Sequence, residues 1–268
     1  MKEISSLQNP LVKFVLKLRQ KQTRDESALF LIEGYREIFR ALQSNWSLQT
    51  LFICEELFLG SNEPALIKKA VQAGASLIKC SRPVFAKIAY RDRPDGLLAI
   101  APQKRASFLD LEKSLNSPRA PLFVIAEAIE KPGNLGTILR SSDAVGADGL
   151  IVCDRCTDLF NPNVVRASVG TLFTLPVLEE SSDATLAWLK KHKVTILAAT
   201  PHACATFTQV DLSGPVAIAV GTEQLGLSQK WMEQATLQVR IPMHGVADSL
   251  NVAMATTLML YEALRQRS

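Results

Sequence analysis

The sequence predicts an α/β protein of two domains. Short apolar runs that are typical of buried strands alternate with segments of helical periodicity along most of the 268 residues. In the second half this alternation favours a parallel sheet. Residues 103–119 break the pattern, apart from a short apolar stretch at 108–115. We therefore expect one domain over 1–105, a linker over 106–119 and a second domain over 120–268, which suits the usual size of domains.

Composition and charge narrow the class of protein. Hydrophobic residues make up 47% and charged residues 21%, which is the composition of an ordinary globular chain and not of a disordered one. The net charge of +4 is uneven, because residues 1–105 carry +7 and the remainder carries −3. A basic first domain suggests a polyanionic partner and leaves the chemistry to the second domain. An ordinary solvated surface is the alternative interpretation.

The five cysteines and the start of the chain indicate a cytoplasmic protein. Only Cys153 and Cys156 are close in sequence, and no second pair or nearby histidine completes a metal site. Free thiols in a reducing compartment are the simpler interpretation. The first residues lack the long apolar stretch of a signal peptide, and no apolar run reaches the length of a membrane span. We expect no metal and no membrane contact.

The first domain is expected to open with a helix at Asn9-Pro10, because asparagine suits the N-cap and proline the first turn. Apolar residues at 11, 12, 15 and 16 give this helix one buried face. Four basic residues share another face at helical spacing: Lys13, Lys17, Lys21 and Arg24. They form either a solvated face or a row of phosphate contacts. Strands are expected next at 28–32, 51–53, 77–80 and 97–101, and helices at 35–42 and 64–73.

The second domain repeats the alternation. Strands are expected at 122–126, 149–153, 194–199, 216–220 and 238–241, and helices from 137 onward, at 162–169, at 184–191, around Trp231 and at 250–264. Ligands of an open parallel sheet bind beyond the carboxyl ends of its strands. Three loops that follow strands have an unusual composition, and together they form the candidate site.

The first of these loops leads from Lys131 into a helix. Gly133 allows a tight turn, and Asn134 and Arg140 supply polar groups six residues apart. If the helix begins near Gly136, Arg140 lies about one turn inside it and can point back toward the loop. A strand–helix turn with a surface arginine is the plain alternative.

The other two loops follow later strands. In the second, 221–228, Glu223 lies between two glycines that let the backbone approach a ligand closely. In the third, 241–251, Ser249 and Asn251 stand where an apolar helix begins. The structural alternatives are that Glu223 is only a charge favoured by a helix dipole and that Asp248 or Ser249 is only an N-cap. No loop carries the glycine fingerprint of a dinucleotide-binding protein, which argues against a nicotinamide-dependent oxidoreductase.

In this order, the three loops resemble the signatures of the SpoU (TrmH-like) family of RNA ribose 2′-O-methyltransferases in the SPOUT superfamily. The resemblance covers about residues 121–266 and includes the segment 161–168. The opening of the chain, with Asn9-Pro10 and Glu33-Gly34, is similar to the family's RNA-binding domain, which is like ribosomal protein L30e. Two departures are Lys131, where an acidic or amide residue is frequent, and Asn163, where lysine is frequent.

The resemblance implies a parallel α/β domain with a deep trefoil knot, a homodimer through that domain, and S-adenosylmethionine as methyl donor without a metal. True knots are rare exceptions, so the knot rests on the resemblance alone. The positions that would hold the cofactor are Thr200, Gly221, Ile241, Met243 and Leu250. The isoleucine and leucine suit the faces of an adenine, and Gly221 permits close approach.

The resemblance also implies a catalytic set and a set of RNA contacts. The catalytic set is Asn134, Arg140, Glu223, Ser249 and Asn251, and the RNA contacts are Lys13, Lys17, Lys21, Arg24 and Arg166. Arg140 would activate the ribose hydroxyl, but a guanidinium with a pKa above about 12 is a poor base. We therefore expect it to orient the hydroxyl and to stabilise the developing alkoxide. Asn134 would fix Arg140, and Glu223 would orient it.

The expected function is methylation of a ribose 2′-OH in RNA. Ribosomal RNA of the 23S type is favoured over transfer RNA as the substrate, because small transfer-RNA enzymes of the family often lack a full L30e-like domain. A transfer-RNA methyltransferase, a catalytically inactive RNA-binding member and a role in antibiotic resistance are the alternatives. Met254, Leu258 and Tyr261 of the final helix suit either a dimer interface or the core of a monomer.

Overall fold

The computed structural model describes residues 2–268 and divides the chain into two compact units. The first unit holds the residues up to Lys104 together with Asp158–Thr174, and the second holds Arg105–Thr157 and Leu175–Ser268. The expected division is corrected in two places. The expected linker 106–119 belongs to the second unit, and residues 158–174 belong to the first. Within the described residues, no helix is long and apolar enough to cross a membrane.

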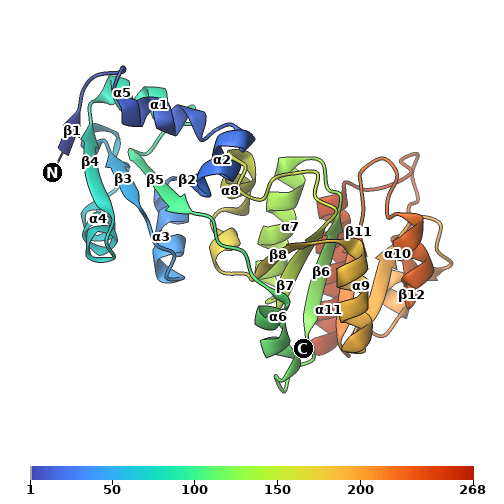
Figure 1. Ribbon diagram of the computed structural model, residues 1–268. Helices are drawn as coiled ribbons and strands as arrows, with labels where there is room; N and C mark the ends of the chain where they lie inside the picture. The colour runs from blue at the N-terminus through green and yellow to red at the C-terminus, as the bar shows by residue number, and fades with distance from the viewer. Residues whose placement is uncertain (1) are drawn as a thin grey trace. The chain divides into compact units, whose positions relative to one another are not determined.

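The first unit is built on a five-stranded mixed sheet (Figure 1). The strands, in spatial order, are β1 (Lys2–Ile4), β4 (Ser76–Cys80), β3 (Thr50–Ile53), β5 (Leu97–Pro102) and β2 (Leu29–Glu33). The first three run parallel, and β5 is antiparallel to both of its neighbours. Its helices are α1 (Pro10–Lys17), α2 (Lys21–Ser27), α3 (Tyr35–Gln43), α4 (Glu63–Gln72), α5 (Arg82–Ile88) and α8 (Pro162–Ser168).

Alternating residues of this sheet build a core on each face, since side chains of a strand point to opposite sides. Phe52 and Ile78 form one core with Val15 of α1 and Phe85 of α5. The sequence did not predict α5 or the short β1. Asn9 does cap α1 as expected, with its side chain accepting from the Leu11 backbone at 2.9 Å.

The second unit is built on a seven-stranded sheet in which every pair of neighbouring strands is parallel, as the sequence predicts. The spatial order is β10 (Ala205–Thr206), β12 (Leu237–Arg240), β9 (Thr195–Ala199), β11 (Val216–Val220), β6 (Leu122–Glu127), β7 (Gly149–Cys153) and β8 (Val177–Glu180). The short β8 and β10 are absent from the sequence prediction. The strand β11, which comes late in the chain, lies between β9 and β6, so the spatial order of the strands differs there from their order in the sequence.

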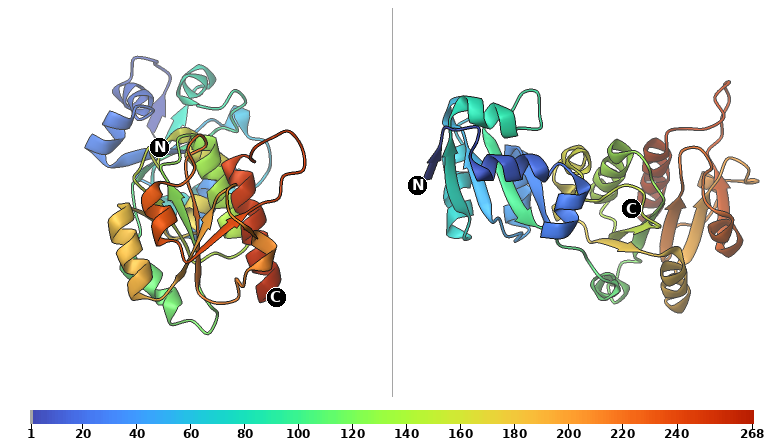
Figure 2. Two further views of the ribbon diagram at one scale, coloured as in Figure 1. Left: turned by 90° about the vertical axis from the view of Figure 1, so that its right-hand side faces the viewer. Right: turned by 45° about the horizontal axis from the view of Figure 1, so that its top comes forward.

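Helices cover both faces of this sheet (Figure 2, left). On one face, α6 (Phe108–Leu115), α9 (Ser182–Lys191) and α10 (Gln229–Gln234) pack on alternate strand residues through Leu111, Trp188 and Trp231. On the other face, α7 (Pro132–Ala144) packs along α11 (Val252–Arg267). Leu111 is fully buried, and Phe108 stacks on Trp188, so the expected linker is in fact part of a core.

Candidate functional site

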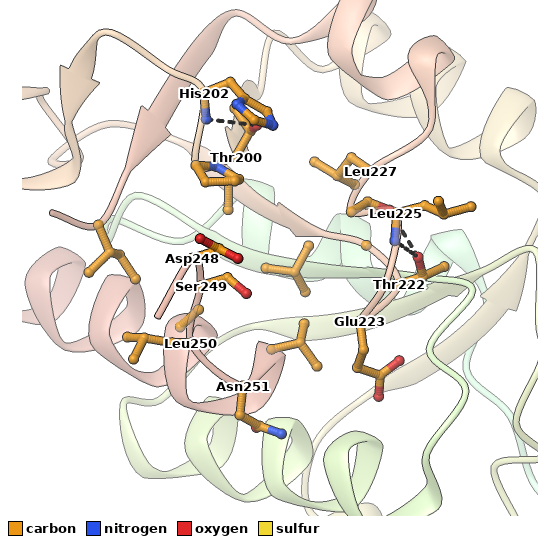
Figure 3. Close-up of a pocket in the computed structure, with 18 of the residues that line it drawn as sticks. Thr200, His202, Thr222, Glu223, Leu225, Leu227, Asp248, Ser249, Leu250 and Asn251 are labelled. Carbon is orange, nitrogen blue, oxygen red and sulfur yellow. Dashed lines mark hydrogen bonds between the residues drawn. The ribbon is translucent and has the colours of Figure 1, made fainter. Parts of the chain in front are cut away.

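A cavity of about 600 Å³ opens at the carboxyl ends of three strands of the second unit (Figure 3). Thr200, Gly221 and Ile241 line it, and each is the first residue after its strand, β9, β11 and β12 respectively. Met243 and Leu250 also line it. All five positions expected to hold a cofactor therefore surround one cavity, whose size is that of a pocket for a small organic ligand.

The loop that contains Gly221 is closed on itself. The backbone N–H of Thr222 donates to the Gly226 carbonyl at 3.0 Å, and the Gly226 N–H donates back to Thr222 at 3.1 Å. A Cβ at Gly221 would lie 2.1 Å from the Gly226 carbonyl oxygen. A side chain at Gly221 would thus collide with the loop's own backbone, so glycine is required there for the loop to close, and Gly221 still lines the cavity.

Three of the expected catalytic residues are joined in one chain of hydrogen bonds. The Asn251 side-chain amide donates to Asn134 Oδ1 at 3.1 Å, and the Asn134 amide donates to Glu223 Oε1. Asn251 also accepts from the Ala253 N–H at 3.0 Å, which makes it the N-cap of α11. Asn251 is therefore both the cap of this helix and a polar group of the site, whereas the sequence placed the alternative N-cap at Asp248 or Ser249.

Glu223 has one carboxylate oxygen without a partner. Its Oε2 is buried and accepts no hydrogen bond among the described residues. Leaving a buried carboxylate oxygen unpaired is costly, so the site has a place for a hydrogen-bond donor or a cation. Glu223 and Asn251 lie along the same edge of the cavity, and Ser249 lies nearby (Figure 3).

Arg140 lies elsewhere than expected. The helix α7 begins at Pro132, so Arg140 is two turns inside it and not one. Its side chain is exposed, and within residues 2–268 it shares no hydrogen bond or ion pair with Asn134 or Glu223. The expected contacts that would orient Arg140 are therefore wrong. The guanidinium is left accessible to a ligand outside the chain.

The cavity also includes residues that sequence reasoning did not assign to the cofactor. They include Lys131, His202 and Asp248. Each lies within three residues of an assigned position, so the spacing along the loops was the available signal. Lys131 is the N-cap residue of α7, and its exposed ammonium adds a positive charge at the rim.

The expected RNA contacts of the first unit are partly corrected. Lys13 and Lys17 are exposed on α1, but α1 ends there, and Lys21 lies on a separate helix, where it pairs with Asp25 at 2.8 Å. Arg24 is only 1% exposed and forms a buried ion pair with Asp158, so its assignment as a phosphate contact is wrong. Arg166 is exposed on α8.

Comparison with known proteins places the chain. Residues 121–261 match the SpoU rRNA Methylase family, and residues 9–99 match the MRM3-like substrate binding domain. The protein belongs to the SpoU rRNA methylase family. The match to the family includes all three loops of the candidate site.

Relatives resemble the chain over nearly its whole length. An uncharacterized tRNA/rRNA methyltransferase of Synechocystis is 33% identical, over 98% of this chain and 94% of its own. The 23S rRNA (guanosine(2553)-2′-O)-methyltransferase RlmP of Bacillus subtilis is 28% identical, over 97% and 98%. The AdoMet-bound rRNA methyltransferase of Sinorhizobium meliloti has a TM-score of 0.88 at 33% identity, covering 98% of this chain and 97% of that one.

The cavity fits S-adenosylmethionine on its own features. Ile241 and Leu250 offer apolar contacts for an adenine, and the unpaired oxygen of Glu223 offers a site for a donor or a positive charge. The cofactor combines an adenosine, an amino group and a sulfonium cation. A pocket that is largely apolar with a few convergent polar groups suits such a ligand.

Proposed function

We propose that this protein transfers a methyl group from S-adenosylmethionine to a ribose 2′-OH of ribosomal RNA of the 23S type. The observation that carries the proposal is the cavity at the ends of β9, β11 and β12, which all five expected cofactor positions line. The chain of hydrogen bonds from Asn251 through Asn134 to Glu223 runs at its edge. The proposal places the enzyme in the cytoplasm, where ribosomal RNA is assembled.

In this reaction the leaving group is already good, and the difficulty lies in activating the nucleophile. A bound sulfonium supplies an activated methyl group, whereas a ribose hydroxyl is barely acidic near neutral pH. The Asn251–Asn134–Glu223 chain holds polar groups in fixed positions where the ribose would lie, and fixed groups contribute much of the rate enhancement of enzymes. Arg140, always charged, stabilises the developing alkoxide and leaves the proton to another acceptor.

The presence of both units favours ribosomal RNA as substrate. RlmP and the Streptomyces viridochromogenes 23S rRNA (uridine(2479)-2′-O)-methyltransferase match 97% and 93% of this chain. A TrmH/SpoU tRNA modifying enzyme of Aquifex aeolicus matches only 59% of it, with a TM-score of 0.51. The presence of both units is therefore a feature that this chain shares with named ribosomal enzymes.

A methylation assay tests the proposal directly. The purified protein is incubated with S-adenosylmethionine labelled in the methyl group and with unmodified transcripts of 23S rRNA and of transfer RNAs. We expect label in 23S rRNA, at a nucleotide whose 3′ linkage becomes resistant to alkaline hydrolysis. Label only in transfer RNA would refute the substrate, label on a base would refute the acceptor, and no label with bound cofactor would favour an inactive RNA-binding member.

Arg140→Ala is expected to reduce turnover about 100-fold or more, because it removes a charge that acts only on the developing alkoxide. Cofactor affinity should stay unchanged, since Arg140 does not line the cavity. Single-turnover rates and calorimetric binding of S-adenosylmethionine measure the two effects. Lys191→Ala, an exposed cation of α9, is the control. A near wild-type rate for Arg140→Ala would sink the assignment.

We further propose that a second copy of the chain covers α11, in the dimer that the family resemblance implies together with the knot. Met254, Leu258 and Tyr261 are 63%, 44% and 50% exposed on this helix. Large apolar side chains gathered on one helix commonly mark an interface. Leu258→Asp is expected to halve the mass measured by light scattering, whereas Leu109→Asp, at another exposed leucine, should leave it unchanged.

A further inference from the structure

The first unit has a shallow hollow on its surface that brings together two arginines distant in sequence. Arg91, from the loop after α5, and Arg166, from α8, both line it. Tyr90 and the carboxylate of Glu33 also line it, and Leu31, Pro162 and Val165 form the apolar part. Arg166 belongs to a segment that sequence analysis assigned to the second domain. The hollow therefore exists only because residues 158–174 fold with the first unit.

Arg91 is held from behind by two buried carboxylates. Glu33 accepts the backbone N–H of Tyr90 at 2.7 Å and that of Arg91 at 3.3 Å, which fixes the loop. The Arg91 guanidinium donates to Glu37 at 2.5 Å, and the Glu37 side chain is only 5% exposed while that of Arg91 is 24% exposed. The guanidinium is thus paired with a buried carboxylate, while about a quarter of the Arg91 side chain stays exposed.

Gly34 completes this arrangement. Its φ of +108° lies in the region that favours glycine, and a Cβ there would lie 2.5 Å from Arg91 Nη1. The Glu33-Gly34 pair is therefore explained by the loop it supports. The glutamate binds the backbone of the loop, and the glycine leaves room for the arginine side chain.

The segment that carries Arg166 is joined to the first unit through the buried ion pair of Arg24 and Asp158. Arg24 Nε and Nη2 both donate to Asp158 Oδ2, at 2.8 and 2.6 Å, and its Nη1 donates to the carbonyls of Leu18 and Arg19. The two side chains are 2% and 3% exposed. Asp158 begins the segment that carries α8, so this pair joins the start of that segment to α2.

An aromatic cluster and a further hydrogen bond secure the rest of the segment. Phe30 of β2 packs on Phe160 with ring centroids 4.7 Å apart, and Trp46 meets Phe173 at 5.1 Å. Arg40 of α3 donates to the Val169 carbonyl at 2.6 Å. Aromatic pairs of this kind add to the burial of their area. Both ends of α8 are therefore fixed to the first unit.

We propose that Arg91 and Arg166 form one phosphate-binding contact for substrate RNA, and that Arg24 is a positioning residue that holds Arg166 there. The inference deepens the proposed function, on which it rests. Guanidinium groups match the geometry of phosphate oxygens, and phosphate contacts position an RNA backbone without reading its sequence. Arg24, which cannot reach a ligand, serves the contact through Asp158.

Salt-dependent RNA binding tests the contact. Full-length protein is titrated against an unmodified 23S rRNA transcript at several salt concentrations. Arg91→Gln and Arg166→Gln should each weaken binding about 5- to 10-fold and reduce the slope of log affinity against log salt by about one. Arg82→Gln, which removes the exposed arginine at the start of α5, should change neither quantity. Wild-type affinity and slope in both variants would overturn the contact.

A paired replacement tests the positioning role of Arg24. In Arg24→Met/Asp158→Leu the ion pair gives way to apolar side chains, a change that buried pairs often tolerate. If Arg24 acts through position, this variant keeps the wild-type salt slope, whereas Arg24→Met alone, which leaves Asp158 without its partner, lowers the slope by about one by displacing Arg166. A wild-type slope in Arg24→Met would refute the positioning role. The proposed function fails separately: a wild-type protein that binds no RNA and methylates none would refute both proposals, while active wild type with unchanged Arg91 and Arg166 variants would refute the contact alone.

Discussion

In the second unit three of the candidate catalytic residues, Asn134, Glu223 and Asn251, bind one another through side-chain hydrogen bonds at one edge of a parallel sheet. In the first unit, of the two arginines proposed to bind RNA, Arg91 pairs with buried Glu37, and Arg166 lies on a segment that the buried pair of Arg24 and Asp158 joins to α2. The catalytic site leaves a buried acceptor atom open, on Glu223, which a ligand can satisfy. In the first unit Glu37, beneath Arg91, also keeps a buried oxygen unpaired. The two sites therefore differ in their partners: Glu223 binds another polar group of the site, whereas Glu37 binds the arginine that it supports.

The largest expected effect is a loss of stability that is confined to the first unit. Asp158→Asn removes the charge that pairs with Arg24, so a buried guanidinium is left uncompensated at a cost of about 3–5 kcal/mol. Unfolding in denaturant should show a first transition shifted by that amount and a second transition unchanged. Cofactor affinity should also stay unchanged, because Asp158 does not line the cavity. A single shifted transition that also lowers cofactor affinity would contradict the division into two units.

The next effect breaks the hydrogen-bond chain of the second unit. Asn134→Ala removes the donor to Glu223 and the acceptor for Asn251, and we expect turnover to fall about 100-fold, the cost of losing one fixed polar group of a site. RNA affinity should remain, since Asn134 belongs to the second unit. Single-turnover rates and filter binding measure the two quantities, with Asn116→Ala as the control. An unchanged rate would show that the chain is structural.

The smallest expected effect is a difference in thiol labelling between the two units of the wild-type protein. Cys54 and Cys80 of the first unit are buried, and burial raises the pKa of the Cys80 thiol to about 12, while Cys156 and Cys204 of the second unit are exposed. At about pH 8 a thiol reagent should label the exposed pair rapidly and leave the buried pair unlabelled, since only the thiolate reacts. Mass spectrometry of peptides identifies the sites. Rapid labelling of Cys80 would mean that the first unit opens readily.

The cavity could be predicted from the sequence because it depends on local patterns. A buried strand followed at once by Thr200, Gly221 or Ile241 places those residues at the carboxyl edge of a parallel sheet, whatever the rest of the chain does. The beginning of α7 was harder, because Gly133 and Gly136 weaken helix propensity while packing on α11 restores the helix.

The first unit shows what sequence periodicity omits. Lys13, Lys17, Lys21 and Arg24 have helical spacing, but the helix breaks between Lys17 and Lys21, and that break turns Arg24 inward. Its partner, Asp158, lies 134 residues further along the chain. Basic residues at helical spacing therefore predict an exposed stripe only when none of them forms a buried ion pair with an acidic residue from elsewhere in the chain.

The late position of Asp158–Thr174 in the chain sets the order in which the protein can be completed during synthesis. The first unit leaves the ribosome before the residues that fill its core, since Phe30 and Trp46 await Phe160 and Phe173. Until then Arg24 lacks its ion-pair partner Asp158, and the apolar surface around Phe30 and Trp46 stays exposed to non-native contacts. The first unit begins to be synthesised first, but it cannot finish folding until more than half of the chain has been made. By then the first strands of the catalytic sheet have also been synthesised.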